Sequence, residues 1–467
     1  MNFIKKTSDV SIIGSGIIGN SIALSMARKG FKVNVYDSGP APGYGTTSYS
    51  SGICRMYYSL LDSVKFSWEG YHYWDSWEDH LAIKDPNGYA KLNKCGALFL
   101  RSKNSNEFLD NSCKLMKQVG VPLSDLTFSE TELYTQHMGM DIQNTYYPRH
   151  IEDPRFGYPD INNKIPGSVY FPETGYVGDP LLATLNVYHA AKELGVKYHF
   201  NTKITGINVG HSNTCHSDTG YADDYGDNGN SKITGITTEN NEKIDCPIVI
   251  NCGGPYSTHI NTMAFKENNI INDSNISCRP LRREVAYTQY DKDNYNIDKH
   301  GKIVIDLDCG LYFRPEVGNK ILIGSTEPLC EPKVWEDDLD TMNTHNTDLW
   351  FNQMCRAALR IPRLEIPNPK NQQYIVSTYD VSDDWTPIYD KSSIDGYYMA
   401  IGTSGNQFKN APVTGEMMAE LVEECENGLD HDNNPLIYKL KKTEGTINTK
   451  MFSRLRSVHS NDRNVFG

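Results

Sequence analysis

Short apolar runs alternate with an amphipathic stretch at the start of the chain. Residues 10–13 form the first apolar run, a glycine-rich turn follows, and residues 20–29 place apolar side chains on one helical face. A second apolar run covers residues 31–36 and ends at Asp37. Because short apolar runs bounded by turns are typical of buried strands, the pattern predicts a strand–turn–helix–strand unit.

The turn in this unit reads Gly-Ser-Gly-Ile-Ile-Gly over residues 14–19. We expect Gly14 to make the tight turn, Gly16 to let a pyrophosphate approach the backbone, and Gly19 to let helix and strand pack closely. The helix N-terminus would offer amide groups and a favourable dipole to the phosphates. Asp37, about 20 residues further on, would accept hydrogen bonds from the ribose. This spacing favours a bound dinucleotide over a turn without ligand, and does not distinguish NAD from FAD.

Later segments continue the alternation of strands and helices. We expect a helix that begins with a proline at residues 180–193, and strands at residues 196–200, 202–207, 233–237 and 246–251. A last apolar strand, residues 397–401, opens onto a small-residue turn at residues 402–405 and a helix at residues 412–424. This turn would give a ligand a second set of backbone amides. Residues 211–231 are predicted to form a long hairpin tip.

A second sheet is predicted where apolar and polar residues alternate. Its strands fall at residues 96–101, 285–290, 303–306, 311–314 and 320–324, and a helix is expected at residues 350–360. The predicted fold class is α/β (α+β), with a Rossmann-like dinucleotide-binding domain and a second, largely antiparallel-sheet substrate domain. We assign residues 1–90, 168–255 and 375–430 to the first domain, 91–167 and 256–374 to the second, and 431–467 to a loosely held tail.

Length and charge narrow the class of function. A chain of 467 residues is too long for one compact core, which agrees with two domains. The formal net charge is -13 and no long Lys/Arg run occurs, so neither a nucleic acid nor an anionic membrane surface is expected as a partner. No apolar stretch approaches the roughly 20 residues that span a bilayer, and residues 1–9 lack the features of a secretory signal. We therefore expect a cytoplasmic protein that acts on a small molecule.

The 11 cysteines form no Cys-x-x-Cys pair and no regular framework, which favours reduced thiols over disulfides. His211, Cys215 and His216 lie close together in the sequence, but the segment around them is rich in Asn, Asp, Ser and Gly. A solvated loop is therefore preferred there to a metal site, and no metal is expected.

Several motifs occur in the order of a known family. They lie at residues 14–19 with Asp37, 46–55, 175–180, 250–255, 312–316 and 402–412. In this order the chain resembles the D-amino-acid oxidase superfamily of FAD-dependent oxidoreductases, most nearly the branch of sarcosine oxidases and dimethylglycine dehydrogenases. The resemblance covers nearly the whole chain and implies that the dinucleotide is FAD.

The resemblance also implies which residues contact FAD. Residues 46–52 would pass beside the pyrophosphate and the flavin, the backbone of Ile204 would contact adenine, and residues 402–409 would line the isoalloxazine ring. Together with the glycine turn, the expected FAD-binding residues are Gly14, Gly16, Ile17, Ile18, Gly19, Asp37, Ser38, Thr46, Thr47, Ser48, Ser51, Gly52, Ile204, Cys252, Gly253, Gly254, Gly402, Ser404, Gly405, Asn406, Gln407, Phe408 and Lys409.

Two positions depart from the sarcosine oxidase pattern. Ser377 stands where that pattern has the cysteine that bears the flavin covalently, and serine cannot form the thioether. The histidine before the Phe-Lys pair is replaced by Asn406 and Gln407. Both changes weaken the case for sarcosine as the substrate, and the first implies that FAD is bound non-covalently.

Amine oxidation by a flavin needs a substrate C–H aimed at the ring, a neutral amine nitrogen and usually a cation that holds the carboxylate. The resemblance places Arg55 and Lys409 near the carboxylate-binding and ring-facing positions, and Arg314 on the substrate sheet is a third candidate. An arginine can clamp a carboxylate through two parallel hydrogen bonds, whereas a lysine acts as a point charge. Tyr379 would frame the substrate. For each of these side chains a purely structural role stays open.

Two further features have a structural and a chemical interpretation. Arg282 and Arg283 could place positive charge near the flavin, but a solvated strand end is preferred. Cys54, next to Arg55, is expected to be a packed side chain and not a nucleophile, because nothing beside it in the sequence would lower its pKa.

These residues predict an FAD-dependent enzyme that oxidises the C–N bond of a small amino acid or an N-methyl or secondary amine to an imine. Its electrons would pass to oxygen or to an electron carrier. Two alternatives stay open: oxidation of a C–OH substrate, for which the sequence shows no strong base or phosphate clamp, and a flavin-binding assembly factor with little turnover.

Overall fold

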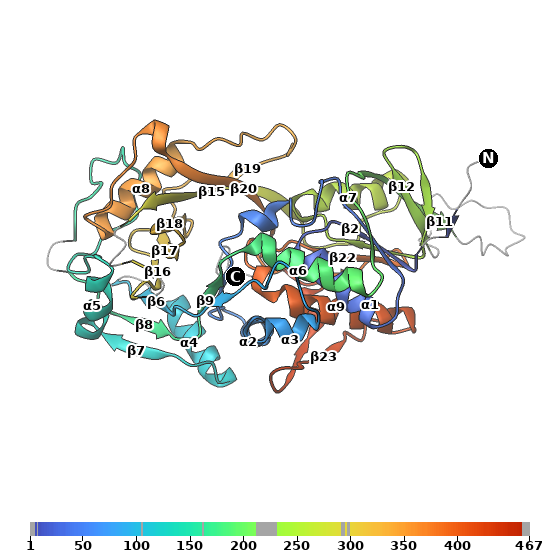
Figure 1. The fold of residues 1–467 in the computed structure, drawn as a ribbon, viewed down its shortest axis with the longest axis horizontal. Helices are drawn as coiled ribbons and strands as arrows, with labels where there is room; N and C mark the ends of the chain where they lie inside the picture. Colours follow the sequence, from blue (N-terminus) through green and yellow to red (C-terminus); the bar gives the residue numbers. More distant parts are fainter. Residues whose placement is uncertain are drawn as a thin grey trace, which may run out of the picture.

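The computed structural model describes residues 5–6, 8–103, 106–160, 163–211, 231–290, 295–296 and 299–459. Two large β-sheets lie side by side along the long axis of the molecule (Figure 1). Parallel and antiparallel strand pairs both occur, and helices pack on the sheets. The predicted α/β class with a second, largely antiparallel sheet is confirmed.

A six-stranded sheet contains the predicted strand–turn–helix–strand unit. Its strands, in spatial order, are β10 (Lys197–His199), β3 (Val33–Tyr36), β2 (Val10–Ile13), β14 (Ile248–Asn251), β22 (Tyr397–Ile401) and β21 (Ile388–Lys391). All neighbours are parallel except β21, which is antiparallel to β22. Because β2, β14 and β22 end at one edge of the sheet, the turns that follow them meet there.

Three helices cover one face of this sheet, namely α1 (Ile17–Arg28), α6 (Pro180–Glu193) and α9 (Ala411–Glu426). Helix α1 lies between the other two (Figure 1). Ile12 of β2, Ile22 of α1 and Met418 of α9 share one core and are fully buried. The predicted helix at residues 180–193 has the observed bounds of α6, while α1 begins directly after Gly16, earlier than its apolar face indicated.

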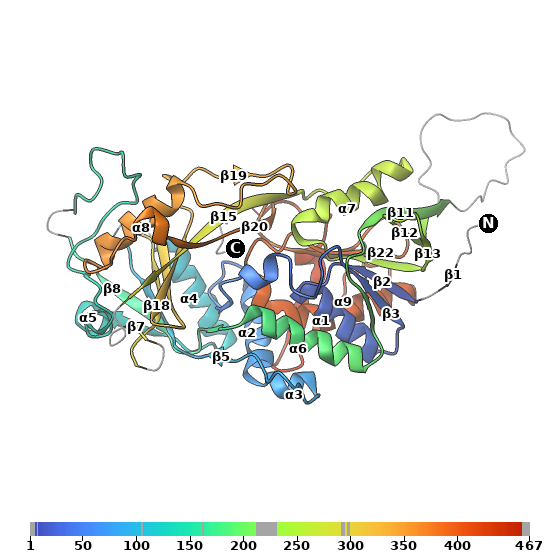
Figure 2. The same ribbon diagram turned by 45° about the horizontal axis from the view of Figure 1, so that its top comes forward.

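A four-stranded sheet and helix α7 (Ser257–Ala264) cover the opposite face (Figure 2). The strands are β1 (Lys5–Lys6), β13 (Lys243–Asp245), β12 (Ser231–Thr238) and β11 (Ile204–His211). Strands β11 and β12 are antiparallel, as the hairpin prediction requires, while its tip, with Cys215 and His216, lies outside the described residues. Within the described ranges, no three His, Cys, Asp or Glu side chains are grouped so that they could hold a metal ion.

The second large sheet has nine strands. Along its main path these are β19 (Val334–Trp335), β15 (Cys278–Gln289), β18 (Lys320–Ser325), β17 (Leu311–Glu316), β16 (Ile303–Asp306), β6 (Ala97–Leu100), β8 (Gly167–Phe171) and β7 (Ser124–Thr127). Strand β20 (Gln373–Ser382) pairs with β15 along almost its whole length. All pairs are antiparallel except β6 with β16. The division into domains stays a prediction, but pairing places β8 and β20 in this sheet.

Each face of the nine-stranded sheet has a different cover. Helix α8 (Asp348–Arg360) buries Trp350 and Met354 against one face. Helices α2 (Leu61–Asp75) and α4 (Glu107–Val119) pack near the strands β6 and β8 on the other side. Near β15 and β20, the nine-stranded sheet comes close to the six-stranded sheet (Figure 1).

Two shorter helices and a small sheet also belong to the described structure. They are helices α3 (Trp77–Leu81) and α5 (Phe128–His137), and the three-stranded sheet of β4 (Ile53–Cys54), β9 (Gly175–Val177) and β5 (Leu92–Asn93). Every described cysteine is free. Among the described helices, none combines the length and the hydropathy that a membrane span requires.

The C-terminal segment is not the loosely held tail that was predicted for residues 431–467. Up to residue 459 it forms the hairpin of β23 (Ile437–Lys439) and β24 (Thr446–Asn448) and a short 3-10 helix, η6 (Thr449–Phe452). Tyr438 and Phe452 are only 0% and 2% exposed. The buried Glu69 carboxylate accepts backbone N–H groups of the loop between β23 and β24 at 2.7 Å. The prediction was wrong because a few apolar residues among many polar ones find a core on distant elements.

Candidate functional site

The glycine turn lies where β2 ends and α1 begins. Gly14 has φ +110°, and a Cβ there would lie 2.3 Å from the carbonyl oxygen of Cys252. A Cβ on Gly19 would lie 2.1 Å from the carbonyl oxygen of Gly14. Both positions therefore require glycine for backbone packing. Helix α1 has no side-chain cap from its own N-cap residue, Gly16, and no acidic residue in its first turn, which suits an anion, while the N–H of Ile17 already donates to the Thr47 hydroxyl.

Gly16 differs from the other two glycines of this turn. Its backbone is extended, and a Cβ there would meet only the Thr47 hydroxyl, at 3.0 Å. Packing within the chain therefore does not explain a glycine at this position. Close approach of a ligand to the backbone does, which agrees with the role predicted for it.

Asp37 lies beside the turn at the end of β3. Its carboxylate accepts the N–H of Ser15 at 2.6 Å and the N–H of Gly39 at 2.7 Å. Its backbone carbonyl accepts the N–H of Thr202 at 2.9 Å, which brings the start of β11, with Ile204, to the same place. The structure thus brings together the residues predicted for the ribose and the adenine.

The segment that follows β3 crosses the N-terminus of α1. The 3-10 helix η1 (Thr46–Tyr49) has no buried residue, and the Thr47 hydroxyl accepts the N–H of Ile17 at 3.2 Å. Strand β20 lies against η1 and against a second 3-10 helix, η2 (Gly254–Tyr256), which follows β14. Residues predicted to bind FAD therefore surround one region between the two large sheets.

Asp380 of β20 holds the turn after β22 in place. Its carboxylate accepts the N–H of Gly402 at 2.7 Å and the hydroxyl of Ser257 at 3.1 Å, and its backbone carbonyl accepts the N–H of Ser404 at 2.7 Å. Burial raises the pKa of this carboxyl to about 7, although the hydrogen bonds from Gly402 and Ser257 oppose the rise. One side chain thus connects β20, the turn at residues 402–405 and the segment after β14.

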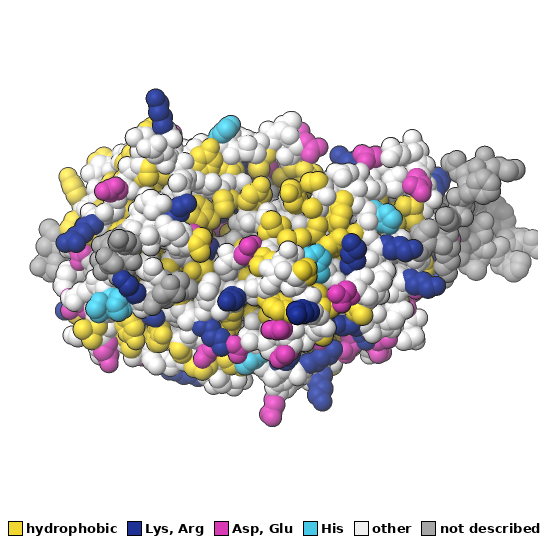
Figure 3. Space-filling model, viewed as in Figure 1, with side chains coloured by type: hydrophobic (Ala, Val, Ile, Leu, Met, Phe, Trp, Pro, Cys, Tyr) yellow, Lys and Arg dark blue, Asp and Glu magenta, His cyan; other side chains and the backbone are white. Residues whose placement is uncertain are grey.

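Together these segments fit a bound FAD. The uncapped start of α1 suits the pyrophosphate, Gly16 leaves the backbone open, and the half-buried side chains of η1 lie beside it. On the face shown in Figure 3, hydrophobic side chains gather in the middle, over the region where the two large sheets meet. The dinucleotide would therefore lie between the six-stranded sheet and the strand pair β15–β20.

Arg55 and Lys409 converge on one aromatic ring. The Arg55 guanidinium carbon lies 4.3 Å from the ring centroid of Tyr58, and the Lys409 Nζ lies 5.0 Å from it. Both cations are buried, at 7% and 2% exposure. The Tyr58 hydroxyl and Lys409 Nζ both donate to the backbone carbonyl of Asn406. The predicted pair is therefore brought together, by a tyrosine that the sequence did not single out.

The charge of Lys409 is poorly compensated. Burial lowers its pKa well below the usual value, and the nearby Arg55 charge lowers it further. In the described part of the chain, no carboxylate forms an ion pair with Lys409. An anion bound between the two cations would relieve both the desolvation and the repulsion.

Arg314 does not share this arrangement. It stacks over Tyr176, with its guanidinium carbon 4.1 Å from the ring centroid, and it forms an ion pair with Glu316 at 2.7 Å. A further hydrogen bond reaches the backbone carbonyl of Pro315 at 3.0 Å. Its charge is thus neutralised within its own strand, which favours the structural alternative, and a role in substrate binding stays a prediction.

Tyr379 packs against the turn at residues 402–405, which follows β22. A Cβ on Gly405 would lie 2.5 Å from its ring, and the Arg283 guanidinium carbon is 5.8 Å from the ring centroid. Burial raises the pKa of the Tyr379 hydroxyl, so it stays protonated. Ser377 faces Arg283 across the strand pair and is half-buried. The four predicted catalytic side chains therefore divide into one converging cation pair, one tyrosine that packs against the turn at Gly405, and one arginine in an internal ion pair.

Arg282 and Arg283 of β15 were predicted to lie at a solvated strand end, and this prediction was wrong. Arg282 is 5% exposed and Arg283 is 8% exposed. Arg282 forms an ion pair with Glu284 at 2.5 Å, and Arg283 lies 3.4 Å from Glu327. Because β15 continues beyond the alternating segment at residues 285–290, both arginines lie inside the sheet, where buried charge requires a partner.

Three residues with strained backbones surround Tyr379. Glu327, Trp385 and Ser404 have φ values of 63°, 61° and 48°, a region that side-chain-bearing residues rarely adopt. Trp385 packs in the cluster that includes Tyr379, and Ser404 precedes Gly405, which meets its ring. Strain of this kind persists where the surroundings over-determine the backbone, and it gathers at functional sites. No local sequence signal marks Glu327 or Trp385, because neither is a residue type that favours this region.

Cys54 is buried beside the cation pair. Burial raises the pKa of its thiol to about 12, although Lys409 opposes the rise. The thiol therefore stays protonated, in agreement with the prediction of a packed side chain.

The comparisons with known proteins agree with this geometry. The model of the FAD dependent oxidoreductase (DAO) family matches residues 9–421. The tRNA 5-methylaminomethyl-2-thiouridine biosynthesis bifunctional protein MnmC of Shewanella amazonensis is 27% identical over 207 residues, which are 43% of this chain and 26% of that protein. The matched part thus spans about a quarter of the relative's length.

Solved structures share the fold over nearly the whole chain. L-proline dehydrogenase from P. horikoshii has a TM-score of 0.69 and 21% identity, with 90% of this chain and 95% of that chain covered. Glycine oxidase from Geobacillus kaustophilus has a TM-score of 0.67 and 17% identity, with coverages of 97% and 100%. L-amino acid deaminase from Proteus vulgaris has a TM-score of 0.66 and 15% identity, with coverages of 98% and 99%.

Proposed function

The chain belongs to the FAD-dependent oxidoreductase (DAO) family, and we propose that it oxidises the C–N bond of a small amino acid or of an N-methyl or secondary amine to an imine. FAD is the cofactor of the family, and when bound it accepts the two electrons of this oxidation. The electrons then pass to oxygen or to an electron carrier. Ser377 cannot form the thioether of a covalent flavin, so we propose that FAD is held non-covalently.

The convergence of Arg55 and Lys409 on Tyr58 is the observation that carries the choice of substrate. Two buried cations with a shared neighbour form a site for a small anion, and the carboxylate of an amino acid supplies that anion. Arg55 can donate two hydrogen bonds in parallel, while Lys409 contributes a point charge. Substrate binding would thus fix the carboxylate and leave the amine end free to approach the ring.

The same cations influence the protonation of the substrate amine. A substrate nitrogen must lose its proton before its lone pair can assist C–N oxidation. Positive charge close to an ammonium group lowers its pKa and favours the neutral amine. Arg55 and Lys409 would therefore both orient the substrate and help to deprotonate it, while Tyr379 frames it from the facing sheet.

The turns around the two large sheets would hold FAD as the sequence predicted. We propose that residues 14–19 and 46–52 hold the pyrophosphate, that Asp37 and Ile204 lie at the ribose and adenine, and that residues 252–254 and 402–409 lie along the rest of the cofactor. Support comes from the uncapped start of α1 and from the Asp380 hydrogen bonds that connect these segments. Glycine oxidase and proline dehydrogenase share the fold and are named for amino-acid substrates.

Anaerobic reduction of the bound flavin tests this proposal. The protein with FAD is mixed without oxygen with matched pairs that differ only by the carboxylate, such as glycine and methylamine or alanine and ethylamine. We expect the visible flavin absorption to bleach with one or more amino acids or N-methyl amino acids, and much faster than with the amine that lacks the carboxylate.

Two other outcomes would contradict the proposal. Bleaching by hydroxy acids or polyol phosphates and by no amine would indicate oxidation of a C–OH bond. A flavin that none of these molecules reduces, but that dithionite does reduce, would indicate a flavin-binding protein with little turnover.

A further inference from the structure

The C-terminal segment of the chain reaches the wall of the candidate site. The family model matches residues 9–421, so the hairpin of β23 and β24 and the residues after it lie beyond the matched part. Phe452 packs against Phe66 of α2 and Tyr389 of β21, with ring centroids 5.1 Å apart in both cases. Phe452 also lines a small cavity together with Tyr58, the tyrosine that both buried cations contact.

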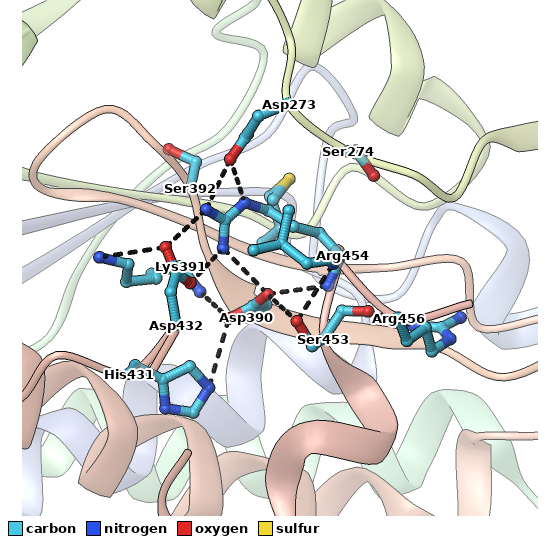
Figure 4. A network of polar contacts seen from close by, with 12 residues as sticks. Asp273, Ser274, Asp390, Lys391, Ser392, His431, Asp432, Ser453, Arg454 and Arg456 are labelled. Carbon is cyan, nitrogen blue, oxygen red and sulfur yellow. Dashed lines mark hydrogen bonds and ion pairs between the residues drawn. The ribbon is translucent and has the colours of Figure 1, made fainter. Parts of the chain in front are cut away.

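Arg454 fastens this segment to the six-stranded sheet. It is 1% exposed, and its guanidinium donates to Asp273 at 2.6 Å, to Asp432 at 2.8 Å and to Asp390 of β21 at 3.2 Å (Figure 4). Asp390 lies on β21 and the other two partners lie in loops, and none of them belongs to residues 384–387. Arg454 therefore acts as an anchor that holds the segment in place.

Arg456, two residues further on, makes a different set of contacts. Its Nε and Nη2 donate to the two carboxylate oxygens of Asp384 at 2.9 Å and 2.8 Å. It also donates to the backbone carbonyls of Thr386 at 2.7 Å and Pro387 at 3.2 Å. Burial would raise the pKa of Asp384, but the hydrogen bonds and charge of Arg456 outweigh it and the pKa is lowered. One guanidinium thus clamps both ends of the turn at residues 384–387.

This turn carries the strained Trp385. With φ 61° and 3% exposure, its conformation depends on the contacts that hold the turn. Its backbone carbonyl accepts a hydrogen bond from the side-chain amide of Asn406 at 3.4 Å. The backbone carbonyl of Asn406 in turn accepts from Lys409 Nζ and, at 3.1 Å, from the Tyr58 hydroxyl.

A continuous series of contacts therefore leads from Arg456 through the Trp385 turn and Asn406 to Lys409. We propose that Arg456 is a positioning residue for the carboxylate subsite, which it orders through the turn at residues 384–387. The inference rests on the proposed function, because it assumes that Lys409 binds a carboxylate. It assigns the segment beyond the family match a role in substrate affinity in addition to its role in stability.

Acetate titration of the FAD-bound protein, followed by the visible flavin spectrum, tests this role. In Arg456→Lys the charge is kept, but the two parallel hydrogen bonds to Asp384 are lost. We expect the Kd of acetate to rise about tenfold, which corresponds to the loss of about 1.4 kcal/mol. Once a substrate is known, its KM should rise by a similar factor with little change in kcat.

Arg454→Lys is the matched control, because it removes side-chain hydrogen bonds to aspartates from another buried arginine of the same segment. It should lower the melting temperature and leave the Kd of acetate unchanged. Asp384→Asn removes the charge and one of the two acceptor oxygens of the clamp without changing the size of the side chain, so it should repeat the effect of Arg456→Lys. It is the test variant if Arg456→Lys does not fold.

The possible results distinguish an error in the role of Arg456 from an error in the carboxylate subsite itself. If the spectrum of the wild-type protein does not respond to acetate, the carboxylate subsite itself is wrong. If the wild-type protein binds acetate and Arg456→Lys binds it equally well, the positioning role is wrong. An equal loss of affinity in both arginine variants would show a general loosening of the segment and would also overturn the role of Arg456.

Discussion

Lys409 is a buried lysine whose surroundings favour a bound anion. Its ammonium group is buried beside Arg55 and Tyr58, and burial and the Arg55 charge both lower its pKa. An anion bound near protonated Lys409 would offset both the desolvation of its charge and the repulsion by Arg55. The structure therefore accounts for the predicted importance of Lys409 through its surroundings and not only through family resemblance.

We predict that Lys409→Met weakens carboxylate binding by about 10- to 100-fold, because a hydrogen bond to a charged group contributes roughly 1.5–3 kcal/mol. FAD binding should be retained, since the contacts of the glycine turn do not involve this side chain. Rates of anaerobic bleaching with an amino acid and with its decarboxylated amine measure the effect. Lys65→Met, at a lysine paired with Asp62, is the control. An unchanged bleaching rate in Lys409→Met would show that the residue is structural.

Gly16 offers a separate test of cofactor placement. Because a Cβ there would meet only the Thr47 hydroxyl, Gly16→Val should fold. It should nevertheless lose FAD, because the added side chain occupies the space in which the pyrophosphate approaches the backbone. Circular dichroism and the flavin absorbance of the purified variant measure the two properties. A folded variant that stays yellow would contradict the placement of the pyrophosphate.

At the level of elements, Asp380 connects segments that are far apart in the sequence. Its pKa of about 7 lies above the value of about 3.9 for an unfolded aspartate. Since the folded pKa is raised, the stabilisation is fully present below the unfolded pKa and is lost as pH rises through about 7. The whole change amounts to at most about 4 kcal/mol, from 1.36 kcal/mol per pKa unit.

Asp380→Asn should remove this pH dependence. The asparagine keeps an acceptor for the N–H of Gly402 and cannot ionise. In urea unfolding with saturating FAD, we expect the wild-type protein to lose stability between about pH 4 and about pH 7 relative to the variant. A stability difference that is the same at both pH values would show that the carboxyl does not titrate in this range.

Strands and helices could be located from the sequence where their apolar residues recur at one regular spacing. The strands β2, β14 and β22 and the helix α6 were all located, because one face or both faces of each meet a core. Helix α2 was not predicted, because its buried side consists largely of aromatic and polar residues, among them Ser67 and Glu69. The hydrogen bonds that make Glu69 acceptable there come from a loop near the other end of the chain.

Only part of the candidate site could be predicted from the sequence. Gly14, Gly16 and Asp37 form a local motif whose geometry follows from its spacing. Arg55 and Lys409 were paired only through family resemblance, since they lie at opposite ends of the chain. Tyr58, Asp380 and Trp385 were missed because their importance arises from contacts between distant segments, which no local pattern records.

The whole molecule places one cofactor site between two large sheets. The six-stranded sheet supplies the turns for FAD, and the pair β15–β20 of the nine-stranded sheet supplies the facing wall. The C-terminal segment joins this arrangement through Arg454 and Arg456, although its polar composition predicted a loose tail. Polar composition gave the wrong prediction for this segment because buried arginine–aspartate pairs neutralise charges inside the fold.

A crystal structure of the protein with FAD and a small carboxylate would show where both ligands bind. We expect the dinucleotide pyrophosphate to lie at the start of α1 and the carboxylate to lie within hydrogen-bonding distance of both Arg55 and Lys409. A carboxylate held elsewhere, with Arg55 and Lys409 covered by the protein or by FAD itself, would contradict this expectation.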